Sequence, residues 1–136
     1  MKRYVILYVS TAIVLFPLDM LWLAVVARSF YRSRLGELLL AAPNYGAAIA
    51  FYVVYVAGIV VFAGAPAAAA GSWRTALIYG GLFGFFAYAT YDLTNLATLK
   101  SWPVTVAAVD LLWGTILSGI SAALGVVIAG LLSPKL

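Results

Sequence analysis

Three aspartates, Asp19, Asp92 and Asp110, each interrupt an apolar segment that is long enough to span a membrane. A carboxylate at the centre of such a helix opposes insertion by about 2.5–3.5 kcal/mol. The three would together cost about 8–10 kcal/mol if their costs simply add, so we do not expect them to face lipid. They are expected to face a protein interior or a water-filled cavity, where carboxylates can bind cations or exchange protons.

The richest polar stretch surrounds Asp92. On a helix, Tyr88, Asp92 and Asn95 share one face at spacings i, i+4 and i+7, and Tyr91 and Asn95 are i, i+4 partners. A phenol, a carboxylate and an amide on one stripe could bind a cation, a polar headgroup or a proton. The alternative is that Asp92 is buried and holds helices together with Asn95. We favour binding, because holding helices together rarely requires three carboxylates.

The pattern Asp-x-x-Trp occurs twice, at Asp19–Trp22 and at Asp110–Trp113. In each pair the two side chains share a helix face at i, i+3. A carboxylate beside an indole ring suits a cationic or amphiphilic guest, through charge pairing and cation–π attraction. The alternative is an interfacial tryptophan next to an aspartate that is already hydrogen-bonded. Because so short a pattern recurs by chance, its value lies in the depth it shares with Asp92.

The composition is that of an integral membrane protein. Of its 136 residues, 66% are hydrophobic and 9% are charged, whereas soluble domains contain about 45–50% apolar and about 25% charged residues. The chain has no cysteine and no histidine, which excludes disulfides, thiol chemistry, the usual zinc and haem ligands and imidazole acid–base catalysis. We predict no metal site and no cofactor. We also predict no nucleic-acid partner, since no basic stripe is interleaved with aromatics.

The hydropathy pattern predicts an all-α fold, with residues 1–136 forming a single domain. Four segments reach the length of about 20 residues that a span requires, and they cover about 4–27, 45–64, 75–98 and 104–132. We expect these four transmembrane helices to form a bundle. Residues 28–44 alternate arginines with apolar residues at near-helical spacing, which is typical of a short amphipathic helix in the membrane interface. The alternative there is a polar loop followed by an early start of the second helix.

Helix counting places the three aspartates in the same half of the bilayer. Four spans put both termini on one side, and each residue of a helix advances about 1.5 Å. Asp19 then lies about 5 Å past the middle of its span, Asp92 about 9 Å past the middle, and Asp110 about 12 Å before it. All three fall in the half away from the termini. We therefore predict a one-sided carboxylate pocket that opens away from the termini, above a tightly packed half rich in small residues, such as Gly80, Gly84, Gly114 and Ser118.

Basic residues flank the spans on both sides. Arg28, Arg32 and Arg34 could pair with the aspartates, bind lipid phosphate or anchor the interface, and we favour anchoring. Lys100, in the tight turn before the last span, is the expected partner of Asp92 or Asp110, because its long stem can reach back into the membrane. Each side carries four basic residues, those on the terminal side being Lys2, Arg3, Arg74 and Lys135. This balance gives no positive-inside bias, and we place the termini in the cytoplasm because the second and third connections carry little charge.

Several of these motifs together resemble a known family. They are the runs at 88–95 (Tyr-Ala-Thr-Tyr-Asp-Leu-Thr-Asn), 101–103 (Ser-Trp-Pro), 110–115 (Asp-Leu-Leu-Trp-Gly-Thr), 18–23 (Leu-Asp-x-x-Trp-Leu) and 30–32 (Phe-Tyr-Arg). The chain resembles family 2177 of the domains of unknown function, an uncharacterised family of small bacterial membrane proteins. The resemblance implies a multi-pass protein of the bacterial inner membrane. It implies no activity and no site residues.

We predict a small membrane protein that binds or transports a small cationic or amphiphilic ligand among membrane lipids. Its four-span size is similar to that of small multidrug transporters, which work as dimers around membrane-embedded acids, so a homodimer is one expected state. One alternative is an intramembrane carboxylate enzyme that acts on lipid or lipid-linked substrates, although the flanking motifs of lipoprotein signal peptidases are missing. Another is an accessory subunit of a larger membrane complex. We favour a protein that is not an enzyme.

Overall fold

The computed structural model of the chain describes residues 1–134, and every regular element in that range is helical. In chain order the elements are α1 (Lys2–Leu21), η1 (Trp22–Val26), α2 (Arg28–Leu35), η2 (Gly36–Leu38), α3 (Tyr45–Ile59), η3 (Val60–Gly64), α4 (Ala65–Ala70), α5 (Trp73–Thr98) and α6 (Val104–Leu132). The elements η1 and η3 are π-helical turns that continue the preceding helix, and η2 is a 3-10 turn. The predicted all-α class is confirmed, and Lys135 lies outside the described residues.

Three helical stretches are long and apolar enough to cross a membrane. They are Lys2–Val26, Tyr45–Ala70 and Val104–Leu132. The fourth predicted span, 75–98, corresponds to α5, which has 26 residues but is less apolar than the other three. Length and composition therefore support three spans within residues 1–134, with α5 as a fourth long helix beside them. The residues that lower the hydropathy of α5 include Asp92 and Asn95, which the sequence assigns to the functional site.

The second long stretch ends later than predicted. A break was expected from Ala65 onward, but the helix continues through η3 and α4 to Ala70. Pro66 does not end it, because it follows directly on the π-helical turn η3, where the α-helical hydrogen-bond pattern has already changed. The stop comes at Gly71, whose φ of +63° is left-handed. Ser72 then caps α5 by accepting a hydrogen bond from the Thr75 backbone N–H at 3.2 Å.

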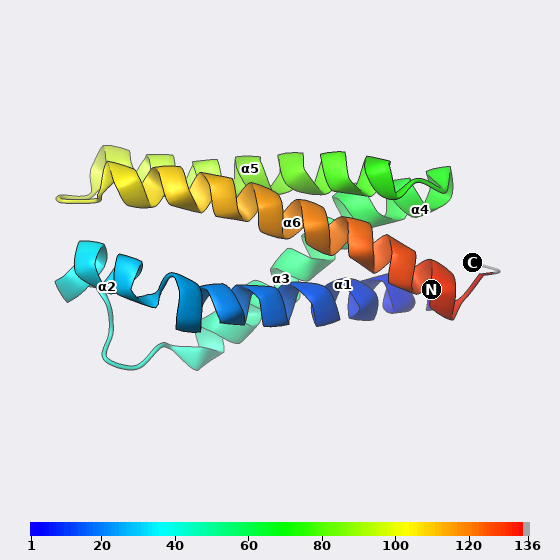
Figure 1. Cartoon of the computed structure of the whole chain (residues 1–136), viewed down its shortest axis with the longest axis horizontal. Helices are drawn as coiled ribbons and strands as arrows, with labels where there is room; N and C mark the ends of the chain where they lie inside the picture. The colour runs from blue at the N-terminus through cyan, green and yellow to red at the C-terminus, as the bar shows by residue number, and fades with distance from the viewer. Residues whose placement is uncertain (135–136) are drawn as a thin grey trace.

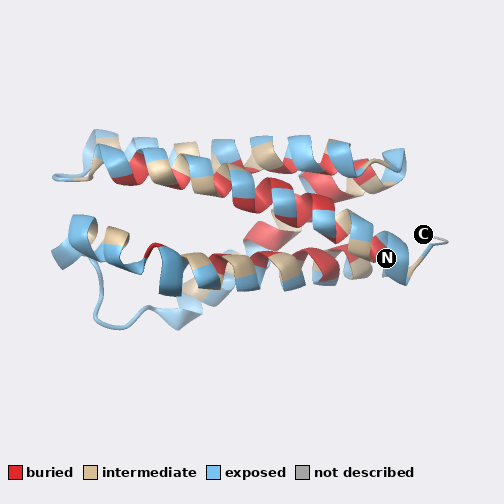
Figure 2. Cartoon of the chain, in the orientation of Figure 1, coloured by how far each residue is buried: buried red, intermediate tan, exposed pale blue. Residues whose placement is uncertain are grey.

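Helix α6 occupies the centre of the arrangement. It packs along α5 and also against α1, while α3 crosses these helices obliquely (Figure 1). Both ends of the chain lie at one end of the molecule, which we call the terminal end. The α5–α6 turn and α2 lie at the opposite end, which we call the turn end. The buried residues form stripes along the facing sides of α1, α5 and α6 (Figure 2).

Glycines allow α5 and α6 to approach closely. A Cβ atom on Gly84 would lie 2.1 Å from the Gly114 carbonyl oxygen, and one on Gly80 would lie 2.6 Å from the Ala122 Cβ. No side chain fits at either position without moving the backbone of α6. The predicted close packing of small residues is thus confirmed at this interface.

The first connection folds back over the turn end. Its predicted amphipathic helix is present as α2, which ends at Gly36, where φ is +43°. The rest of the connection, 39–44, is not helical, so the helical expectation holds only for its first part. The Arg34 Nε donates a hydrogen bond of 3.1 Å to the Thr105 hydroxyl near the start of α6. This contact joins α2 to the start of α6, at the same end of the molecule as the α5–α6 turn (Figure 1).

Candidate functional site

Asp19 is held by donors from two other helices. Only 4% of the residue is exposed. Its Oδ2 accepts a hydrogen bond of 2.6 Å from the Tyr52 hydroxyl on α3, and its Oδ1 accepts one of 3.0 Å from the Trp113 Nε1 on α6. Helix α1 runs through Pro17 without interruption and brings Asp19 to this point. Both carboxylate oxygens are therefore satisfied, and neither donor carries a positive charge.

Asp110 is linked to the first connection. The residue is 7% exposed, and its Oδ1 accepts a hydrogen bond from the Tyr31 hydroxyl on α2. The Tyr31 oxygen in turn accepts a hydrogen bond of 3.1 Å from the Trp22 Nε1. Burial and the bond to Asp110 raise the pKa of Tyr31 above its ordinary value. Tyr31 therefore keeps its proton and remains a donor at neutral pH.

The two Asp-x-x-Trp motifs interlock. The rings of Trp22 and Trp113 stack with centroids 4.4 Å apart and planes 10° from parallel. Asp19 accepts a bond from the tryptophan of the other motif, and Asp110 is reached by Trp22 through Tyr31. The π-helical turn η1 begins at Trp22, whose carbonyl accepts from the Ala27 N–H at 2.8 Å. Such turns often occur at functional sites.

Asp92 differs from the other two aspartates. It is fully buried, at 0% exposure, and neither carboxylate oxygen has a hydrogen-bond partner within residues 1–134. It lies beside Asp110 and Trp102, but the Trp102 Nε1 also lacks a partner, so the two groups fall short of hydrogen-bond geometry. A buried carboxyl group without a partner is costly, which makes Asp92 the least satisfied group of the site.

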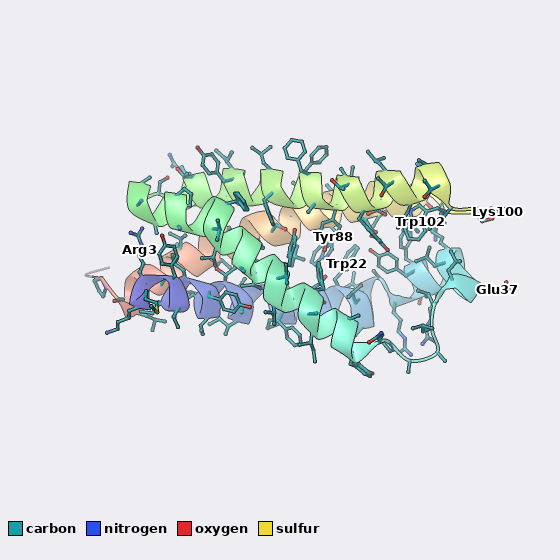
Figure 3. The ribbon with its side chains drawn as sticks, turned by 180° about the vertical axis from the view of Figure 1, so that it is seen from behind. Arg3, Trp22, Glu37, Tyr88, Lys100 and Trp102 are labelled. Atoms are coloured by element: carbon teal, nitrogen blue, oxygen red, sulfur yellow. The ribbon has the colours of Figure 1, made fainter. Side chains whose placement is uncertain are left out.

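The other residues of the predicted α5 stripe divide between the interior and the surface. The Tyr88 ring lies over Gly114, where a Cβ atom would come within 2.2 Å of it. Tyr88 is within electrostatic reach of both Asp19 and Asp110, and Figure 3 shows it above Trp22. Asn95 is half-buried.

Tyr91 points away from the interior. The residue is 53% exposed, and its ring meets the Trp102 ring edge-on at 5.7 Å. The structure therefore brings Tyr88 and Asp92 to the interior and leaves Tyr91 at the surface.

The predicted ion pairs are replaced by aromatic donors. Arg28, Arg32, Arg34 and Lys100 are all exposed. Lys100 was expected to pair with Asp92 or Asp110; within residues 1–134 the Asp92 oxygens have no hydrogen-bond partner, and the hydrogen bond to Asp110 comes from Tyr31. Lys100 lies in the α5–α6 turn at the end of the molecule, where its ammonium group reaches water more easily than it reaches the buried carboxyl (Figure 3).

Three residues of the site were not predicted from the sequence. Tyr31 was assigned only to the amphipathic segment 28–44 and Trp102 only to the turn before the last span, while Tyr52 was not singled out at all. A signal was available for Tyr31 and Tyr52. Buried carboxylates in a chain without histidine and with exposed arginines still require donors, and tyrosine hydroxyls are the most numerous aromatic donors in this sequence.

Two hollows of residues 1–134 lie away from the aspartates: a groove at the terminal end and a shallow depression along α3. The three aspartates also do not converge on one point, since no three acidic side chains in the described range could hold a metal ion. Asp19 and Asp110 thus belong to an acidic network that the stacked indoles and Tyr31 of α2 complete. Within residues 1–134, no basic side chain is hydrogen-bonded to it.

Comparison with known proteins identifies a family. A family model described as "Predicted membrane protein (DUF2177)" matches residues 4–127, which is nearly the whole chain. The resemblance seen in the sequence motifs is thereby confirmed. No curated protein and no solved structure matches the chain.

Proposed function

We propose that this chain, which belongs to the DUF2177 family of predicted membrane proteins, binds a small cationic or amphiphilic ligand at its buried aspartates. The observation that carries the proposal is Asp92, a fully buried carboxyl group without a partner beside a second carboxylate. A positive group placed between Asp92 and Asp110 would satisfy both, in a low-dielectric region where charge attraction is strong. The stacked rings of Trp22 and Trp113 add π faces that favour organic cations.

A proton can occupy the same place as the ligand. Without a cationic guest, a proton on Asp92 removes the repulsion between two adjacent carboxylates. A cation that enters would displace this proton. Binding is then coupled to proton release, which is the elementary step of cation–proton exchange across a membrane. Entry requires α2 to move, because Tyr31 and Arg34 hold it against α6.

We further propose that α5 crosses the membrane, which gives four spans. Its 26 residues extend about 39 Å at 1.5 Å each, more than the hydrocarbon core of about 30 Å. It packs against α6, which is itself long and apolar enough to span. Of its polar residues, Asp92 is buried and Asn95 is half-buried, which shields these two side chains from lipid. We place the protein in a bacterial inner membrane with its termini in the cytoplasm.

The span count can be tested by labelling single cysteines, since the chain has none of its own. Ala70→Cys and Ser101→Cys lie at opposite ends of α5, and both residues are exposed. In intact cells, a membrane-impermeant maleimide should label Ser101→Cys only. Labelling of both positions from the same side would show that α5 does not cross, and labelling of Ala70→Cys alone would reverse the orientation.

The binding proposal can be tested with tetraphenylphosphonium as a probe cation. Calorimetry on protein in lipid nanodiscs should detect binding to the wild type and a loss of at least about tenfold in affinity for Asp92→Asn, because one of the two charges that attract the probe is removed. Glu37→Gln is the matched control. Glu37 is the one remaining acidic residue of the chain, is exposed and lies at the same end.

Proton release provides a second reading of the same experiment. Titration in two buffers of different ionisation enthalpy should show that about one proton leaves per cation bound to the wild type. An absence of binding, or equal binding by wild type and Asp92→Asn, would contradict the proposal. A loss of affinity in Glu37→Gln as large as that in Asp92→Asn would mean that surface charge, rather than the buried site, attracts the probe.

A further inference from the structure

The terminal end carries a groove that the aspartate site does not use. A cavity of about 330 Å³ opens there between α1, α4 and α6. Its apolar wall includes Leu7 of α1 and Val126 of α6, and its rim includes Arg3 and Trp73. The close packing that the sequence predicts for this half of the molecule therefore does not extend to its end.

Among residues 1–134, the charged side chains at or next to this groove are all basic. Arg3 lines the groove, and its guanidinium makes one hydrogen bond, a long one of 3.5 Å from Nη2 to the Ala65 carbonyl. Arg74 stands nearby, over the Trp73 ring at 5.5 Å. Lys2 is the neighbour of Arg3 and is exposed.

No acidic residue offsets these charges, because the four acids of the chain are Asp19, Glu37, Asp92 and Asp110. All of them belong to the half towards the turn end, and Figure 3 shows Glu37 at the end opposite Arg3. The terminal end is consequently a basic surface around an apolar groove.

We propose that this groove binds an anionic phospholipid, with the phosphate at Arg3 and part of an acyl chain on the apolar wall. A guanidinium group forms paired hydrogen bonds with phosphate, and the bond to Ala65 is weak enough to be exchanged. A soluble anion would gain nothing from the apolar wall, whereas an acyl chain would. The groove also lies where helices of this length leave the hydrocarbon core, at the depth of lipid headgroups. This inference does not depend on ligand binding at the aspartates.

Native mass spectrometry of the detergent-solubilised full chain can test the site. Phosphatidylglycerol should be retained in preference to phosphatidylcholine with the same acyl chains. Arg3→Gln should weaken the binding of phosphatidylglycerol by about tenfold, whereas Lys2→Gln, which removes the same charge one residue away, should change it by less than about twofold. Gly130→Phe provides a second variant that keeps every charge. Gly130 lines the groove, and a Cβ atom added there would meet nothing within 4 Å, so a phenyl ring can be introduced at this wall, where it should compete with the acyl chain.

Fluorescence locates the bound lipid. Trp73 is the tryptophan that lines the groove, so the difference between wild type and Trp73→Phe isolates its emission. Phosphatidylglycerol with brominated acyl chains should quench this emission more than brominated phosphatidylcholine does.

Three results would overturn the proposal. The first is equal retention of both lipids by the wild type. The second is equal loss of phosphatidylglycerol in Lys2→Gln and Arg3→Gln, which would indicate general surface charge. The third is displacement of phosphatidylglycerol by millimolar glycerol phosphate, which would indicate a site for a free anion.

Discussion

Replacing two of the buried aspartates by alanine should have opposite effects on stability. Asp19→Ala removes the acceptor of two hydrogen bonds, from Tyr52 and from Trp113, and leaves both donors unpaired. Asp92→Ala removes a carboxyl group that has no hydrogen-bond partner, so no donor loses a bond. Both residues are at least 96% buried and lose the same atoms, so the costs of the two cavities largely cancel in the comparison.

The size of the difference follows from the two bonds of Asp19. In a water-soluble protein, a hydrogen bond to a charged group contributes about 1.5–3 kcal/mol. Within a membrane the unfolded helices stay in lipid and find other partners, so interhelical bonds contribute about 0.6 kcal/mol on average and about 1.7 at most. The membrane value applies here. We therefore expect Asp19→Ala to be less stable than Asp92→Ala by about 1–3 kcal/mol, and Asp92→Ala to be at least as stable as the wild type.

Unfolding by sodium dodecyl sulfate in mixed micelles, followed by circular dichroism, would measure both variants. The reasoning would be refuted if Asp92→Ala lost as much stability as Asp19→Ala, because Asp92 would then be a structural residue. Together with a loss of cation binding, an unchanged or raised stability of Asp92→Ala would show that the residue is kept for function at some cost to the fold.

Three further outcomes are expected. Gly84→Ala should destabilise the protein by about 1–3 kcal/mol through overpacking against α6. In Gly81→Ala the new Cβ would meet its nearest atom at 3.7 Å, so this variant should be neutral or should stabilise the helix by up to about 1 kcal/mol. The same unfolding assay measures both variants. Joining Arg34→Cys to Thr105→Cys with a short bis-maleimide should prevent tetraphenylphosphonium from binding, and the untreated double variant, which should still bind it, is the control. Because the pKa of Tyr31 is raised in the folded protein, its hydrogen bond is fully present below the unfolded-state pKa of about 10. The bond is lost as the pH rises through the higher folded-state pKa. Proteolysis of the first connection should therefore stay constant from about pH 6 to 9, and a rise within that range would contradict this reasoning.

The fold could be predicted because its signals are strong and local. Apolar runs, Pro103 and the arginines after Ala27 give helix bounds that the structure reproduces within a few residues. The late end of the second helix could not be predicted in the same way, because the π-helical turn before Pro66 lets the helix run on and the left-handed Gly71 is where it stops. The polarity of α5 led to the prediction of a site there, and the same polarity keeps α5 out of the three stretches that are apolar enough to span.

The site could be predicted only in part, because the sequence gives the depth of each residue but not its partners. Equal depth correctly grouped Asp19, Asp110 and their tryptophans. It did not indicate that each aspartate would be bonded to residues outside its own motif. Tyr52 contacts Asp19 across an interface whose crossing angle is set by packing along the entire helices, and no local pattern encodes that angle.

The distribution of donors among the three aspartates also bears on function. The chain has no histidine, and its arginines remain in the interface, so only hydroxyl, indole and amide groups can satisfy buried carboxylates. Tyrosine and tryptophan do so for Asp19 and Asp110 without adding positive charge, which leaves the network acidic. Within residues 1–134, Asp92 receives no hydrogen bond from such a donor, although the indole of Trp102 lies beside it. A group from outside the chain would supply the partner that Asp92 lacks in the described part of the chain, and this is the role that we propose for the cation.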